Sequence, residues 1–436
     1  MKYIQLLWAL LSFQEHLEFE PARLAAHEGH RIYSEMSTGN WWWYTQYRLP
    51  TGATIVPVKR ASDKTHLANL SGDQHTWPLY PTIGNIRKDI RRTPQQCASI
   101  LSGLIHSAPK GAKYIDEAWH STVGTVMSQL RHIDITGPGL KLDSADGLQR
   151  QHYPLLAAWF GDYPEHVMVA QVSYGSGLMC EILQGSLMGH STFWLLNNSR
   201  DRHIYPELLE DNYLDAQHTV GVHPIRNQFW QYFLCNVYCI WQPDELHELL
   251  LGSVKDWLHR LLKYLKDSNV EDQFDSRFTS VPQYPGLQYL SKPCHSLKSG
   301  TWQGKEIRGM IRILSVNCAP ILDCSKDDSK TVAENAFYEK VMGAVQAVCK
   351  FSLLVSQQND SDLSLKVLFA QLNRFYQKKS IFPEHKVLKS AKAKVDDLLA
   401  TESHQLHEQR IHKIRATMEA LLHGAEKVSS TKCRQF

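Results

Sequence analysis

The 436-residue sequence lacks long hydrophobic runs and a strong net charge of either sign. No apolar stretch reaches the roughly 18 residues that a membrane-spanning helix needs, so no transmembrane segment is expected. The formal net charge is only +3, so charge alone neither supports nor excludes a nucleic-acid partner. Hydrophobic residues make up 43% of the chain and charged residues 21%, which is typical of a globular protein that buries a sizeable core.

The sequence also lacks the cysteine pattern of a small disulfide-bonded domain. Its nine cysteines are an odd number, scattered along a long chain, and none forms a CxxC pair. We therefore expect reduced thiols in an intracellular protein. The apolar stretch 3–13 resembles a signal-peptide core, but no small-residue cleavage site follows it, so a buried first helix is the preferred interpretation.

Short nucleotide-binding motifs and internal repeats are absent as well. The sequence contains neither GxGxxG nor GxxxxGK[ST], so it has no fingerprint of a dinucleotide site or a P-loop. No Ser-His-Asp or Cys-His arrangement has a local signature, although such triads are defined by geometry and not by spacing. Any chemistry must therefore be sought in residues that the fold brings together.

Strand patterns are concentrated in the first half of the chain. Residues 49–90 contain two apolar runs around a polar loop and predict two strands. Pro57 and Pro78 lie inside these runs, and we expect them to weaken the strands or to place them at edges or bulges. Asp146-Gly147 is a hairpin signal, and the apolar run 153–160 that follows it predicts a buried strand.

Helical patterns dominate the rest of the sequence. Residues 112–133, 226–265 and 334–378 carry apolar residues at helical spacing. In the stretch 387–425 the apolar spacing alternates between three and four, which is typical of a coiled-coil seam that needs a partner. The overall pattern predicts a mixed α/β fold, and the seam suggests self-association or a helical protein-interaction module as an alternative function.

Two aspartates follow apolar runs and are candidate metal ligands. Asp63 comes after the first predicted strand and Asp162 after the run that ends at Phe160. Acids at the ends of neighbouring strands can converge, and Mg²⁺ needs only one or two carboxylates together with waters and substrate phosphates. Two such ions about 3.5–4 Å apart support phosphodiester cleavage. The alternative is that both residues are ordinary turn or cap residues.

A second pair of candidates and a candidate zinc site have simpler explanations. Asp244 and His247 would share one helix face, as a carboxylate–imidazole pair or as a cap and a surface histidine. Cys180, His190 and His203 are the right ligand types for zinc, but a closed structural site needs four ligands. We therefore expect no intact zinc site.

Basic and aromatic clusters raise the question of nucleic-acid contact. Arg87, Lys88, Arg91 and Arg92 would either hold phosphates or form a solvated charged turn. The cluster "GNWWWYTQY" (39–47) would either pack in the core or an interface, or stack on bases. Both alternatives remain open at the level of sequence.

Several long strings carry a resemblance to a known family. They are "YSEMSTGNWWWYTQYRLPTGATIVPVKRASDKTHLANLSGDQHTWPLYPTIGNIRKDIRR", "GLQRQHYPLLAAWFGDYPEHVMVAQ" and "WQPDELHELLLGSVKDWLHRLLKYLK". Over roughly residues 20–400 the chain resembles the Plavaka-type transposases of fungal genomes, relatives of the CACTA group of cut-and-paste DNA transposases. The resemblance implies a ribonuclease-H-like core with a large helical insertion, Mg²⁺- or Mn²⁺-dependent strand cleavage and transfer at transposon ends, and a nuclear location.

The resemblance also implies roles for particular residues. The block "ASDKT" matches the position of the first catalytic acid, which is Asp63, and "GDYPE" matches the second, which is Asp162. Asp146 in "SADG" competes for the second role. The Asp-x-x-His signature of the wider group corresponds to Asp244 and His247.

The sequence departs from the family pattern in two places. Gly177 and Leu178 stand where relatives carry the first Cys and the Pro of Cys-Pro-x-Cys, so only Cys180 of that pair remains. The third catalytic Glu is expected after the helical insertion, and neither Glu402 nor Glu408 is assigned to it. A DNA-binding region expected ahead of the core is also not found. We therefore expect a truncated remnant, a DNA-cleaving transposase by ancestry that is inactive.

These patterns divide the chain into four expected parts. They are an N-terminal helical and aromatic segment, a partial ribonuclease-H-like core, a helical insertion and a basic coiled-coil-like tail: 1–48, 49–225, 226–380 and 381–436. The tail holds ten Lys/Arg against seven Asp/Glu, so the excess positive charge of the chain lies there.

Overall fold

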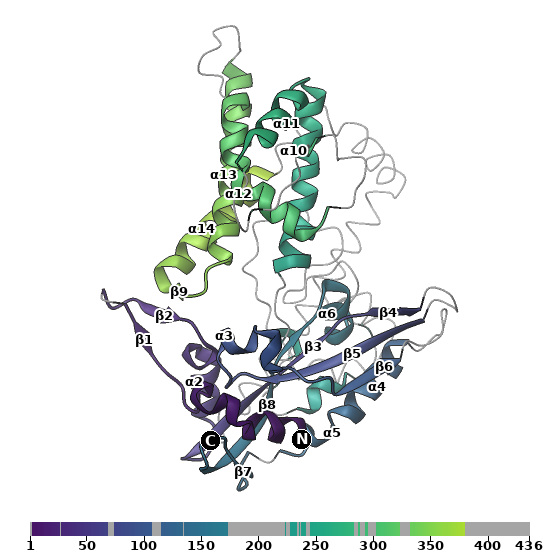
Figure 1. The fold of residues 1–436 in the computed structure, drawn as a ribbon, viewed down its shortest axis with the longest axis vertical. Helices are drawn as coiled ribbons and strands as arrows, with labels where there is room; N and C mark the ends of the chain where they lie inside the picture. Colours follow the sequence, from purple (N-terminus) through teal and green to yellow (C-terminus); the bar gives the residue numbers. More distant parts are fainter. Residues whose placement is uncertain are drawn as a thin grey trace, which may run out of the picture.

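The structure is a computed structural model in which a sheet-centred unit and a helical unit can be described (Figure 1). The described residues are 2–172 (without 27, 69–73, 107–114 and 134), 223, 227–232, 235, 237–240, 245–282, 287, 293–294, 302–322 and 332–379. The expected coiled-coil seam at 387–425 lies outside them. None of the described helices is long and apolar enough to cross a bilayer.

A mixed six-stranded sheet forms the centre of the first unit. Its strand order is β4-β5-β3-β8-β7, and β6 also pairs with β5. β3 runs antiparallel to β5 and parallel to β8. The strands are β3 Ala53–Ser62, β4 Thr65–Ala68, β5 Gln74–Ile83, β6 Gly103–His106, β7 Leu140–Asp143 and β8 Gln149–Phe160. The predicted mixed α/β class is thereby confirmed.

The prediction about the two prolines is confirmed in part. The ladder of β3 with β8 has a register irregularity between Val58 and Lys59, directly after Pro57. Neither β3 nor β5 lies at an edge of the sheet. The antiparallel ladder between β3 and β5 runs from Val58 opposite Ile83 to Ser62 opposite Leu79. Pro57 precedes one end of this ladder, and Pro78 precedes the other end. Neither proline therefore needs to donate a hydrogen bond to that ladder, and the strands tolerate them without moving to an edge.

The hairpin predicted at Asp146-Gly147 is confirmed. It joins β7 to β8, which pair antiparallel, and Gly147 has a φ of +78°, a conformation that glycine adopts without strain. The predicted buried strand 153–160 forms most of β8. Residues 152–159 of this strand are all buried, as expected of a strand covered on both faces.

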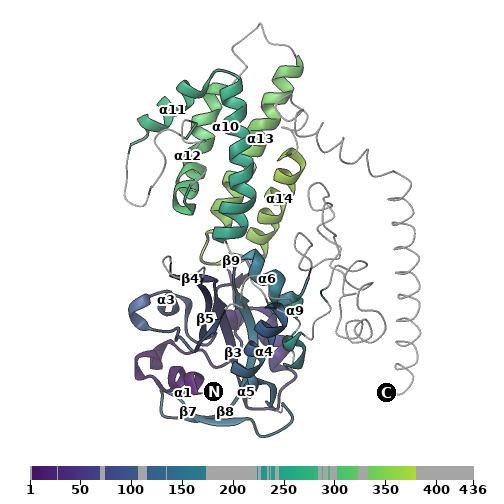
Figure 2. The same ribbon diagram turned by 90° about the vertical axis from the view of Figure 1, so that its right-hand side faces the viewer.

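Helices cover both faces of the sheet, as Figure 2 shows, with α1 and α3 on one side and α4, α5, α6 and α9 on the other. Trp8 of α1 and Trp119 of α4 are both buried in the same core as Trp159 of β8. The helix predicted over 112–133 is confirmed as α4 and α5. The elements are α1 Lys2–Ala9, α2 Asn40–Gln46, α3 Lys88–Arg91, α4 Ile115–Val126, α5 Ser128–Arg131, α6 Tyr163–Ala170 and α9 Val237–Ile240, with short 3₁₀ turns η1 Leu11–His16, η2 Met36–Thr38, η3 Pro94–Gln96 and η4 Gln228–Gln231.

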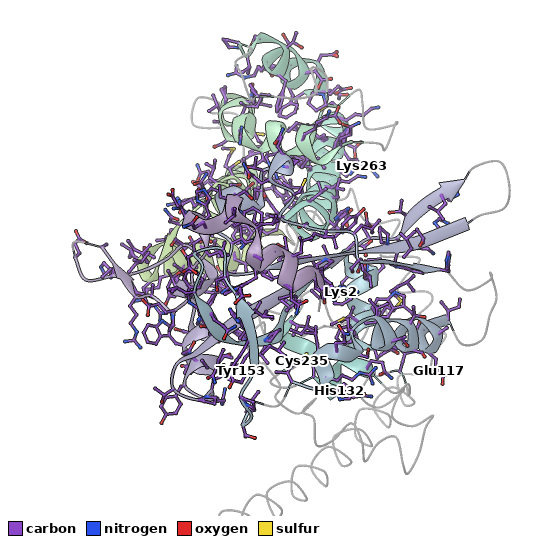
Figure 3. All side chains as sticks on the ribbon, turned by 60° about the horizontal axis from the view of Figure 1, so that its bottom comes forward. Lys2, Glu117, His132, Tyr153, Cys235 and Lys263 are labelled. Carbon is purple, nitrogen blue, oxygen red and sulfur yellow. The ribbon has the colours of Figure 1, made fainter. Side chains whose placement is uncertain are left out.

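The second unit is helical and has its own core, with Leu258, Ile307 and Val345 among its fully buried residues. Figure 3 marks Lys263 in this unit and Tyr153 in the sheet below it. The helix pattern at 334–378 corresponds to two helices separated by a short strand. The elements are η5 Glu245–Val254, a π-helix, then α10 Lys255–Asp267, α11 Glu271–Ser280, α12 Gly304–Leu322, α13 Val332–Val355, β9 Asp360–Ser361 and α14 Asp362–Lys379.

A small second sheet connects the two units. Its strand order is β1-β2-β9, with β1 Leu24–Ala25 and β2 Arg31–Tyr33 from the N-terminal region. The carboxylate of Asp362, at the start of α14, accepts from the Tyr33 hydroxyl at 3.0 Å and from the Arg31 backbone N–H at 3.3 Å. These contacts attach the helical unit to the N-terminal segment.

Candidate active site

Asp63 and Asp162 lie at the same end of two adjacent parallel strands. β3 and β8 pair in parallel, and their last paired residues are Ala61 and Phe160. Each aspartate follows its strand's last paired residue by two positions, so the two carboxylates leave the sheet at one edge. Adjacent strands are about 4.8 Å apart. The structure therefore places two acids that are far apart in the sequence just beyond the same ends of neighbouring strands, and both act electrostatically on Glu165.

Both aspartates keep oxygen atoms free for a ligand. Asp162 is the N-cap of α6, and one of its oxygens accepts from the backbone N–H of Glu165 at 2.9 Å. Within the described part of the chain its other oxygen has no hydrogen bond or ion pair, and the Asp63 carboxylate has none at all. Asp63 is exposed and Asp162 is half-buried. A cation from solvent can reach both.

A third carboxyl group, Glu165, is buried beside this edge. Its side chain is 3% exposed, and one oxygen lies 3.5 Å from the Trp159 indole nitrogen, which also donates to the Ser62 hydroxyl at 3.0 Å. The other oxygen has no hydrogen-bond partner among the described residues. Burial raises the pKa of Glu165 well above its ordinary value, and the negative charges of Asp162 and Asp63 raise it further.

Sequence reasoning did not identify Glu165 as part of the site. The available signal was the D-x-x-E pattern at Asp162, which is that of a capping box. A capping box would turn the glutamate back toward the backbone of the helix start. Here the side chain turns instead toward Trp159, a contact that depends on the packing of the sheet.

The donor set does not form a site in which protein ligands enclose a metal ion. Among the described residues, no group of three or more His, Cys, Asp or Glu side chains is arranged to hold a metal ion. Mg²⁺ is commonly held by one or two carboxylates, with waters and substrate phosphates as the other ligands. Asp63 and Asp162 are the residues that would supply those carboxylates.

Asp146, the competing candidate for the second acid, lies at the opposite end of β8. Both of its carboxylate oxygens accept from the Arg150 guanidinium, at 2.8 and 2.6 Å. The Arg150 hydrogen bonds are the main reason that the pKa of Asp146 is lowered. Asp146 is therefore not brought near Asp63, and its oxygens are already used within the hairpin.

The other candidate ligands do not join this edge of the sheet in the described structure. His247 lies on η5 of the helical unit, where it is exposed. Asp244, Cys180, His190 and His203 lie outside the described residues.

The predicted basic cluster is divided between solvent and the protein interior. Arg92 and Arg87 are exposed, and Arg87 forms an ion pair with Asp89 at 3.1 Å. The Lys88 ammonium donates to the backbone carbonyl of Ser34. It also donates to the Gln358 carbonyl and the Asn359 side chain, in the loop before β9. The Arg91 guanidinium donates to backbone carbonyls of its own segment. Three of the four cations thus already have protein partners, and only Arg92 has no partner among the described residues.

The fold and this edge define a mixed α/β protein with paired carboxylates at the ends of adjacent parallel strands. Residues 1–262, more than half of the chain, match the Plavaka transposase family, and the chain belongs to that family. No curated protein matches the chain. The family match confirms the resemblance seen in the sequence and covers the whole six-stranded sheet with both aspartates.

Proposed function

We propose that the chain carries a ribonuclease-H-like centre for metal-dependent cleavage and transfer of DNA strands at transposon ends. The observation that carries the proposal is the parallel pairing of β3 with β8, which places Asp63 and Asp162 at one edge. The order of elements supports it: antiparallel strands come first, then helix α4, then a strand parallel to β3. The helical unit after the sheet is consistent with the helical insertion expected of such a core.

Asp63 and Asp162 would hold Mg²⁺ or Mn²⁺ in this centre. The ion would supply activation of water and stabilisation of the leaving oxygen of a phosphodiester. The position of Asp162 as the N-cap of α6 fixes its carboxylate, and the helix N-terminus favours its negative charge. The exposed guanidinium groups of Arg87 and Arg92, at the two ends of α3, would contact DNA phosphates.

We further propose that the 436-residue chain binds metal and DNA but does not cleave DNA efficiently by itself. No residue in it is assigned as the third catalytic carboxylate, and Glu402 and Glu408 lie outside the described residues. A pair of carboxylates can bind a cation, whereas strand cleavage by the proposed mechanism requires the complete set of acids. We therefore expect the chain to keep metal and DNA binding and to lack strand cleavage.

Calorimetric titration of the full chain with Mn²⁺ tests the metal site. Asp63→Asn and Asp162→Asn should each weaken Mn²⁺ binding at least tenfold. Asp146→Asn is the matched control, because it removes a carboxylate of the same sheet that is already paired with Arg150. Unchanged Mn²⁺ affinity in both Asp63→Asn and Asp162→Asn would refute the site.

A nicking assay on DNA that carries the element's terminal repeats tests the second part of the proposal. In Mg²⁺ or Mn²⁺ the chain should produce no cleavage above background. Cleavage that Asp63→Ala abolishes would show that the centre is complete, and the inactive interpretation would be wrong.

A further inference from the structure

The aromatic cluster of helix α2 is divided between the core and the surface. Trp42 is fully buried with Ile55 and Tyr153, so core packing accounts for this residue. Tyr44 is 65% exposed and Tyr47 is 92% exposed. Core packing does not account for these two rings, and they are among the most exposed large hydrophobic side chains of the described structure.

A pocket of about 350 Å³ lies at the C-terminal end of α2 and is lined by Trp41, Tyr44, the buried Thr45 and Arg48, which follows the helix. Trp41, Tyr44 and Thr45 are separated by three and four residues and so lie on one face of the helix, and the turn after α2 brings Arg48 to the same pocket. Trp41 packs against the core beneath, which holds this wall in place. The volume is at the small end of the range of about 300–1,000 Å³ for pockets that hold small organic groups.

Two arginines without an acidic partner in the described part of the chain lie beside these rings. No Asp or Glu occurs between residues 36 and 62. Arg48 is exposed, and within the described residues its guanidinium has no hydrogen bond or ion pair. Arg23 is also exposed and lies over the Trp43 ring at 4.8 Å from its centroid. The surface therefore combines flat aromatic faces with cations that lack an internal counter-ion.

We propose that Trp41, Tyr44, Tyr47 and Arg48 form a binding surface for single-stranded DNA. Bases stack on the aromatic rings, and the arginine contacts the phosphate backbone, the combination that single-strand binding proteins use. Duplex DNA does not offer the faces of its bases to such rings. Proline-rich peptides also bind aromatic pockets, but they carry no charge that would complement Arg48 and Arg23.

This surface is distinct from the carboxylate site. α2 packs at the beginning of β3, whereas Asp63 follows the end of the same strand, and Figure 1 shows α2 far from the hairpin of β4 and β5. A ten-residue strand is about 33 Å long. The inference therefore goes beyond the proposed catalytic centre and does not depend on metal binding there.

Fluorescence anisotropy of a labelled 15-nucleotide oligothymidine with the full chain tests this proposal. Binding is measured in EDTA, so the outcome is independent of the metal site. Tyr44→Leu/Tyr47→Leu should weaken binding about tenfold or more, because stacking on each aromatic ring contributes substantially to affinity. Tyr44→Phe/Tyr47→Phe keeps the rings and should retain the affinity of the unmodified chain.

Salt dependence tests the role of the arginine. Arg48→Gln should reduce the slope of log affinity against log salt by about 0.7, the value for one phosphate contact on a single strand. A thermal melt of each variant checks folding, which we expect to be unchanged because the substituted side chains are exposed. The proposal is overturned if the leucine variant binds like the unmodified chain, if duplex of equal length binds as well as the single strand, or if a proline-rich peptide binds and oligothymidine does not.

Discussion

Replacement of Glu165 by Gln tests whether the Glu165 carboxyl group, which lies beside Asp63 and Asp162, is protonated in the folded protein. Glu165 is 3% exposed, one of its oxygens lacks a partner among the described residues, and Asp162 and Asp63 contribute like charge. All three features favour the neutral acid. Gln keeps the size and the polar atoms of the side chain but cannot ionise, so it mimics the protonated state.

The expected magnitude follows from proton linkage. The pKa of Glu165 is raised in the folded protein, so between the unfolded and folded pKa values the folded chain holds one proton more than the unfolded chain. The unfolding free energy therefore falls by about 1.4 kcal/mol per pH unit in that window as pH rises. Glu165→Gln removes this contribution, so the variant should match the unmodified chain near pH 4 and exceed its stability at neutral pH.

Urea denaturation from pH 4.5 to 7.5 in EDTA measures this difference. Glu117→Gln is the matched control, because Glu117 is an exposed acid on α4 and its substitution should leave the pH profile unchanged. If the stability of Glu165→Gln runs parallel to that of the unmodified chain across the range, Glu165 is ionised in the folded protein and the reasoning fails.

Two further substitutions test the surroundings of this edge. Trp159→Phe removes the N–H that donates to Ser62 and Glu165, so we expect the free energy of unfolding to fall by about 1–3 kcal/mol in urea denaturation. An unchanged free energy of unfolding would contradict the role of that donor. Burial lowers the pKa of Lys59 on β3 to about 7, so the unmodified chain should gain stability as pH rises from 7 toward the ordinary lysine pKa of about 10.4. Lys59→Met should therefore stabilise the protein most below pH 7. A pH-independent effect in denaturation at pH 6 and 9 would argue against a desolvated ammonium at this partly buried position.

Local patterns predicted the parts of the fold that depend on local physics. The apolar run before Asp63 and the run 153–160 were predictable as strands, because their apolar side chains are the ones that the sheet buries. The hairpin at Gly147 followed from a dipeptide that tolerates a positive φ. The effect of the two prolines was predicted only in part. An irregularity does follow Pro57, but neither strand moves to an edge, because the β3–β5 ladder begins and ends beside the prolines. A single strand's sequence carries no information about its partner's register.

The candidate site was partly predictable for the same reason. Asp63 and Asp162 were recognisable as acids after apolar runs, but only the parallel pairing of β3 and β8 shows that they share an edge. The burial of Glu165 against Trp159 depends on the tertiary structure and has no signal beyond the capping pattern. Likewise, spacing could not separate the buried Trp42 from the exposed Tyr44, since both belong to one aromatic run.

A crystal structure of the chain grown with Mn²⁺ tests the central claim most directly. We expect an anomalous peak at the edge of the sheet, in contact with carboxylate oxygens of both Asp63 and Asp162. The two carboxylates should lie within about 8 Å of each other, since ions of a metal pair are about 4 Å apart. A larger separation, or Mn²⁺ bound only elsewhere on the chain, would contradict the account.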